Sequence, residues 1–296
     1  MVFWGITFVA FKYANLSFEP IAIVFIRLVI SIPFLFGFAW ISRRMMKIKK
    51  GDFKWFLLLA VFEPFFYFLG EAFGLSMVSS TVGAILISTI PLFVPIAAYF
   101  TIRERLSPMN IVGLLVSFGG VIMVVMATEG QFSGNLKGIL LMFLAVISAV
   151  GYTIMAKKLV HDYNGIIITA WQSTLGAVLF LPLFLIFELK RIDLGAMQTD
   201  SVWAILYLGI FGSGVCFILF TTGIRELGAT KANVFANLVP VITAILSYFM
   251  LKEAMPLLKI LGIAVVLAGL LLSQLSGNEA SNGFKRWKKW FSMPRV

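Results

Sequence analysis

Three ionisable side chains, Arg27, Glu63 and Glu71, lie inside long apolar stretches of the sequence. An ionisable group at the centre of a membrane helix costs about 2.5–3.5 kcal/mol on insertion scales, so it usually faces a cavity or a partner. At 1.5 Å per residue, we expect Arg27 roughly 10 Å below the outer face, Glu63 near mid-membrane and Glu71 near the outer end. Two interpretations stay open. Either Glu63 or Glu71 binds a substrate amine or a coupling proton, or Arg27 forms a buried ion pair with one acid that only fixes packing.

The two acids share one predicted helix face with Tyr67, because Glu63, Tyr67 and Glu71 follow one another at intervals of four residues. We expect this face to look inward, with Tyr67 as a polar aromatic wall. Pro64 directly follows Glu63 and removes a helix hydrogen bond, so a bend is expected there. The bend either opens a pocket beside the acid or is a packing kink.

Several polar residues in other helices are further candidates for substrate contact. Asn233 and Asn237 stand one turn apart on one face, and Ser88 is the counterpart of Asn237 in the first half. Such side chains seek partners within a bilayer, and these are either neighbouring helices or a substrate. Pro91 and Pro240 follow Ser88 and Asn237 by three positions and are expected to be bends at which each half flexes.

Trp4, Tyr152 and Trp171 are candidate aromatic residues of a cavity. Since 15% of the chain is aromatic, simple packing is the alternative for each. Gln172 stands where Arg27 stands in the first half, so any cation site is expected on one side only.

These residues must be positioned by membrane-spanning helices. Apolar residues make up 60% of the chain and charged residues 12%, against about 25% charged in soluble domains. A bilayer-spanning helix needs roughly 20 apolar residues, whereas barrel strands alternate apolar and polar residues. We therefore predict an all-α polytopic protein with ten helices. The apolar runs are 1–14, 20–41, 55–73, 81–100, 110–127, 137–156, 165–187, 201–224, 231–251 and 257–275.

The first run is too short to span alone, so we expect either a start upstream or a helix that ends within the membrane. A cleavable signal peptide is not expected, because a charged head and a small-residue cleavage site are missing.

The net charge of +11 is distributed unevenly between alternate loops. With the amino terminus inside, the inner loops and tail hold 17 basic residues and the outer loops hold six. The positive-inside rule then places both termini in the cytoplasm of a multi-pass inner-membrane protein. The basic excess reflects topology, and no nucleic-acid partner is expected. In the basic tail, 277–296, the apolar and basic residues are typical of a helix on an anionic leaflet or of a solvated tail.

An internal repeat divides the chain into two halves. At a displacement of 149 residues, eleven of the 47 positions from Gly74 to Gly120 are identical, including glycine and proline positions. We read residues 1–128 as a first five-helix repeat and 136–276 as a second, followed by the cytoplasmic tail. An odd number of spans inverts the second copy, which is the usual construction of alternating-access transporters with a mid-membrane site.

The pattern resembles the EamA family of the drug/metabolite transporter superfamily over essentially the whole chain. The matching residues are Trp4 with Gly5, Lys12, Arg27, 72–75, Pro91, Glu104, Gly223, Pro240 and Glu253. The resemblance implies a ten-helix permease, commonly an exporter of amino acids, other metabolites or toxic compounds. The short first helix is a departure from it.

Other classes are disfavoured by missing motifs. The sequence has no GxxxxGK[ST] phosphate loop for an ATP-driven pump, and its single histidine, His161, lies in a short loop, which argues against an enzyme. The lone Cys216 allows neither a disulfide framework nor a thiolate metal site, and no cofactor or metal is expected. The prediction is a secondary transporter, most simply an exporter, of small metabolites such as amino acids or of lipophilic cations. It works as a monomer or homodimer in a lipid bilayer, and a channel or uncoupled facilitator is the alternative.

Overall fold

The computed structural model describes residues 1–102, 108–127, 136–189, 197–252 and 254–275, and every regular element in these ranges is helical. The chain is therefore all-α, as predicted. Glu104 and Glu253, which carry part of the family resemblance, and the tail 277–296 lie outside the described residues.

The first part of the chain begins with two helices and continues through an interrupted third one. Its elements are α1 (Val2–Ala14), α2 (Pro20–Ile41), η1 (Lys50–Asp52), α3 (Phe53–Ala60), η2 (Val61–Phe66), α4 (Tyr67–Met77), α5 (Ser80–Ile87), α6 (Ile90–Ile102) and α7 (Pro108–Met126).

The second part follows a similar order of elements. They are α8 (Leu136–Leu159), α9 (Gly165–Leu183), η4 (Phe184–Glu188), α10 (Thr199–Tyr207), η7 (Leu208–Val215), α11 (Cys216–Leu227), α12 (Ala229–Val234), η8 (Phe235–Asn237), α13 (Leu238–Met250) and α14 (Leu257–Leu275).

Six helical segments within the described ranges are long and apolar enough to cross a membrane. They are Pro20–Ile41, Lys50–Met77, Leu136–Leu159, Gly165–Glu188, Thr199–Leu227 and Ala229–Met250. Large apolar side chains cover the outside, with Trp40 and Ile41 each 76% exposed and Ile186 71% exposed. Such a surface suits lipid rather than water, so the chain is a multi-pass membrane protein.

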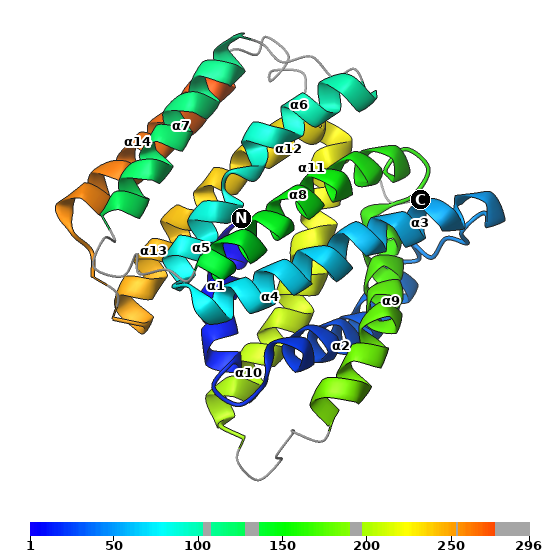
Figure 1. Cartoon of the computed structure of the whole chain (residues 1–296). Helices are drawn as coiled ribbons and strands as arrows, with labels where there is room; N and C mark the ends of the chain where they lie inside the picture. The colour runs from blue at the N-terminus through cyan, green and yellow to red at the C-terminus, as the bar shows by residue number, and fades with distance from the viewer. Residues whose placement is uncertain (103–107, 128–135, 190–196, 253, 276–296) are drawn as a thin grey trace.

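Helices α7 and α14 lie side by side at one edge of the molecule (Figure 1). A Cβ added to Gly120 would lie 2.6 Å from the carbonyl oxygen of Gly262, and one added to Gly269 would lie 2.7 Å from that of Gly113. Because the higher-numbered end of α7 meets the lower-numbered part of α14, the two helices are antiparallel. Glycine is what allows their backbones to approach so closely.

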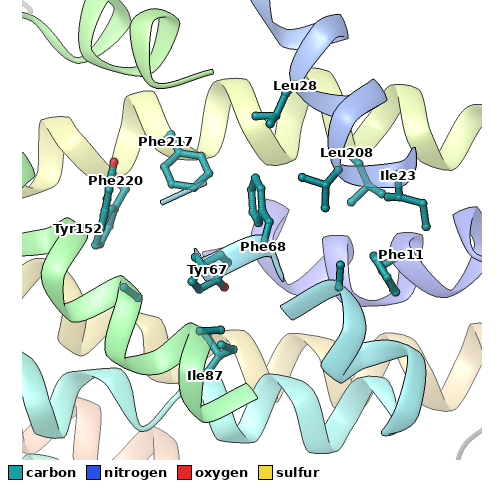
Figure 2. Packing of buried hydrophobic residues seen from close by; sticks show 14 of the residues in the cluster. Phe11, Ile23, Leu28, Tyr67, Phe68, Ile87, Tyr152, Leu208, Phe217 and Phe220 are labelled. Atoms are coloured by element: carbon teal, nitrogen blue, oxygen red, sulfur yellow. The ribbon is translucent and has the colours of Figure 1, made fainter. Parts of the chain in front are cut away.

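The remaining helices pack around α1, α4 and α8. Buried rings fill the space between them, as Figure 2 shows for Phe11, Phe68, Tyr152 and Phe217. Lys12 of α1 donates hydrogen bonds to the carbonyl oxygens of Leu75 and Val78 at the end of α4. The last carbonyl groups of a helix have no hydrogen-bond partner within it, so the Lys12 ammonium group supplies one and joins α4 to α1.

Candidate functional site

A small cavity of about 50 Å³ lies between helices from both parts of the chain. Six residues that the sequence singled out line it, namely Trp4, Glu63, Tyr67, Glu71, Tyr152 and Asn233. They come from α1, η2, α4, α8 and α12. Residues more than 200 positions apart thus surround one space, which makes this cavity the candidate site.

Glu63 reaches the cavity from a break in the third membrane segment. Its backbone leaves the helical region, with φ −147° and ψ 114°, inside the wider turn η2 that also contains Pro64. The Glu63 side chain is buried, and it forms no hydrogen bond or ion pair with any described residue. An acid without a direct polar partner among the described residues therefore faces the cavity.

Glu71, in contrast, already has two partners. The Tyr67 hydroxyl donates a 2.9 Å hydrogen bond to Glu71 Oε1, and Arg27 Nη1 lies 3.7 Å from Glu71 Oε2. The Arg27–carboxylate pair that the sequence left open is thus formed with Glu71. A single arginine balances one of two neighbouring acids, so Glu63 needs a proton or a positively charged ligand to be neutralised.

Arg27 lies beside the cavity, and a residue of the second part of the chain binds its side chain. Its Nε donates a 2.8 Å hydrogen bond to Ser213 Oγ, and its guanidinium carbon lies 4.2 Å from the centre of the Phe68 ring. A Cβ on Gly212 would lie 3.0 Å from Arg27 Nη2, so the missing side chain leaves room for the guanidinium. Sequence reasoning missed Ser213 and Phe68, because neither is charged or marked by spacing.

Aromatic rings also line the cavity. Trp4 packs edge-on against Phe217 and Phe220, with ring centroids 5.5 and 5.1 Å apart, and Tyr152 stacks on Phe220 at 6.3 Å. Figure 2 shows Tyr152, Phe220, Phe217 and Phe68 in sequence across the core. Ring faces of this kind attract cations.

Polar groups of α8 and α12 also line the cavity. Asn233 Nδ2 donates a 2.9 Å hydrogen bond to the carbonyl oxygen of Ala229 and lies 3.4 Å from Thr153 Oγ1. The Tyr152 hydroxyl is buried without a hydrogen-bond partner among the described residues. A buried hydroxyl of this type is available to a ligand in the cavity.

Ser88 and Trp171, two of the predicted binding residues, are not among the residues that line the cavity. Ser88 donates its hydroxyl to the carbonyl oxygen of Ile85 in the preceding helical turn. Trp171 lies elsewhere and packs edge-on against Phe36 at 6.2 Å. The side chain of Asn237 is outside the described part of the structure, although its backbone lies in η8.

The two prolines predicted as bends in the other helices stand at helix starts. Pro91 is the second residue of α6 and Pro240 the third of α13. Proline suits the first turn, where the backbone N–H has no partner in the helix. The interruptions therefore precede the prolines, at the α5–α6 junction and in η8.

Apolar helices around a mostly apolar cavity that holds two acids define a polytopic membrane protein with an internal site. The chain belongs to the EamA-like transporter family, whose model matches residues 1–126 and again 136–275. It is thus a membrane transporter and not an enzyme, and the resemblance seen in the sequence is confirmed.

Two of the similar proteins carry transporter names. An "uncharacterized transporter" of Archaeoglobus fulgidus is 29% identical over 92% of this chain and 95% of its own. The "uncharacterized transporter YetK" of Bacillus subtilis is 28% identical over 85% of this chain and 77% of its own. A WAT1-related chloroplastic protein of Arabidopsis thaliana is 28% identical over 94% and 68%. One crystal structure shares the fold, with a TM-score of 0.76 over 92% of this chain and 93% of that chain at 16% identity.

Proposed function

We propose that this chain is a secondary transporter that exports small molecules bearing a positively charged amine, such as amino acids or lipophilic cations. The observation that carries the proposal is the Glu63 carboxyl, which lines the cavity and forms no hydrogen bond or ion pair with any described residue. A substrate ammonium group or a coupling proton would neutralise it, and the two would then compete for one site. Trp4 and Phe220 would hold the apolar part of the substrate.

Alternating access is supported by the size of the cavity. Small-molecule sites usually measure about 300–1,000 Å³, so a cavity of about 50 Å³ must widen to admit a substrate. Glu63 stands at a break in its helix, where backbone hydrogen bonding is already interrupted. Movement of α3 against α4 at this break would change the volume of the cavity, and few further helix hydrogen bonds would be broken.

Hydrogen bonds join the two parts of the chain at both ends of the molecule. Near the start of α3, Tyr163 donates a 2.7 Å hydrogen bond to Asp52 Oδ2. Near the start of α2, Ser17 Oγ lies 3.0 Å from Ser201 Oγ. The 22 residues of α2 separate these two ends. In the proposed cycle the ends open in turn, whereas a channel would need both open together.

A five-plus-five inverted repeat is supported by the element bounds. Displaced by 149 residues, α4 falls on α11 to within one residue, and α7 falls on α14 at both ends. The interruptions η2 and η7 fall together as well. The antiparallel contact of α7 with α14 is the arrangement that inversion requires. We therefore retain 1–128 and 136–276 as the two repeats, with 277–296 as a tail.

The orientation follows from the charges. Six basic residues lie between residues 43 and 54, at the end of the molecule that also holds Tyr163. The positive-inside rule places this end, and with it both termini, in the cytoplasm of an inner-membrane protein.

Uptake into proteoliposomes tests the proposal, using labelled amino acids and organic cations with and without an imposed pH gradient. Saturable uptake and counterflow of at least one amine are expected. Failure of every amine would overturn the substrate class, and uptake without saturation or counterflow would indicate a channel. A rate that ignores the pH gradient would remove proton coupling from Glu63.

A further inference from the structure

An open groove of about 640 Å³ lies at the end of the molecule where α2 finishes and α3 begins. Its floor is aromatic and comes from three elements, with Phe36 in α2, Phe53 in α3 and Trp171 in α9. The stretch that follows α2 adds the apolar side chains of Met45, Met46 and Ile48. The volume is in the range of roughly 300–1,000 Å³ that ligands of moderate size occupy.

The apolar part of the groove extends along the helices away from their ends. Phe36 lies five residues before the end of α2, and Trp171 lies six residues after the start of α9. At 1.5 Å per residue, both rings stand roughly 8–9 Å inside the helix ends. Trp40 and Ile41, each 76% exposed, mark the neighbouring surface as one that meets lipid. A water-soluble ligand without an apolar chain would leave this part of the groove unfilled.

The rim of the groove is strongly basic. It carries Lys47, Lys49 and Lys50, all of them exposed. Lys49 lies 3.9 Å from Asp162, whereas Lys47 and Lys50 form no ion pair with any described residue. The nearby acid Asp52 already accepts a hydrogen bond from Tyr163. Two ammonium groups are therefore available to an anion at the mouth of an apolar groove.

We infer that this groove binds an anionic phospholipid, with the headgroup phosphate between Lys47 and Lys50 and an acyl chain along Phe36 and Trp171. Basic side chains beside a membrane helix attract anionic lipid with about 1 kcal/mol for each lysine, and basic pockets between helices hold anionic headgroups. The bound lipid would tie the stretch after α2 to α9, and so connect the two parts of the chain at this end. This site is separate from the substrate cavity, since the two share no lining residue.

Native mass spectrometry of the whole protein, delipidated in detergent and then mixed with phosphatidylglycerol or phosphatidylcholine, tests the inference. The native protein should retain phosphatidylglycerol in preference to phosphatidylcholine. Lys47→Gln with Lys50→Gln should lower phosphatidylglycerol retention about fivefold for each lysine removed. Trp171→Ala should lower the retention of both lipids, because it removes part of the floor.

Arg225→Gln is the matched control, because Arg225 is an exposed base in the last turn of α11 and does not line the groove. It should retain phosphatidylglycerol as the native protein does, and thermal melting should show that all variants are folded. Equal retention of the two lipids by the native protein would overturn the inference, as would unchanged retention by the double lysine variant. Displacement of the lipid by soluble glycerol phosphate would also overturn it and indicate a site for a soluble anion.

Discussion

Arg27 Nη1 and Glu71 Oε2 lie 3.7 Å apart beside the cavity, in helices α2 and α4. This pairing divides the roles of the two membrane-embedded acids. Glu71 is held by an arginine and a tyrosine, whereas Glu63 has neither and faces the same cavity. We propose that the first acid serves the fold and that the second remains for the ligand.

Replacing each acid by glutamine should separate these roles. Glu63→Gln removes the proposed charge partner of the substrate, and a hydrogen bond to a charged group is worth about 1.5–3 kcal/mol. Uptake at limiting substrate should therefore fall roughly tenfold to a hundredfold. Glu71→Gln should lower the yield of folded protein while each folded molecule still transports. Uptake normalised to folded protein is the measurement.

The opposite result has a clear meaning. If folded Glu71→Gln loses transport while Glu63→Gln keeps it, the roles are reversed. Asn233→Ala is a useful companion, because Asn233 lines the same cavity without carrying a charge. It should weaken uptake less than Glu63→Gln does.

Removing Arg27 should destabilise the protein more than removing the whole pair. Arg27→Met leaves Glu71 buried without its counter-ion, and breaking a buried pair costs about 3–5 kcal/mol. Adding Glu71→Leu removes the unpaired acid and should recover most of that loss. Thermal melting in one detergent gives the order of the three proteins. A double variant that melts no higher than Arg27→Met would show that the pair contributes little.

The sequence was informative where a residue was unusual for its surroundings. Charges and a proline inside apolar runs pointed to Arg27, Glu63, Glu71 and Pro64, all of which meet at or beside one cavity. The helical class followed from run length alone. Such residues are informative because placing an ionisable side chain in the membrane costs free energy, so each one needs a partner or a function at its position.

The positions of the apolar residues, in the core or at the lipid surface, were not predictable in the same way. Phe217 and Phe220 face the core, whereas Leu219 between them is 57% exposed, and all three belong to one apolar run. In a membrane both faces of a helix are apolar, so hydrophobicity does not separate core from lipid. For the same reason the sequence could not show that Trp171, a predicted cavity residue, lines a separate groove.

The contact of α7 with α14 should be sensitive to one glycine and tolerant at its neighbour. A Cβ on Gly120 would lie 2.6 Å from backbone atoms of Gly262 and Val266, whereas one on Gly119 would meet nothing within 4 Å. Gly120→Ala should therefore destabilise the helix pair by about 1–3 kcal/mol, as overpacking does. Gly119→Ala should leave the melting temperature unchanged. Equal melting of the two variants would contradict the close approach of these helices.

Locking one end of the molecule should stop alternating access. Ser17 Oγ and Ser201 Oγ lie 3.0 Å apart on the two parts of the chain, and two cysteines at these positions are close enough to form a disulfide. We expect Ser17→Cys with Ser201→Cys, in a Cys216→Ser background, to lose uptake on oxidation and regain it on reduction. Each single cysteine variant should be indifferent to the oxidant. Full uptake by the cross-linked protein would mean that this end does not open during transport, and that the proposed cycle is wrong there.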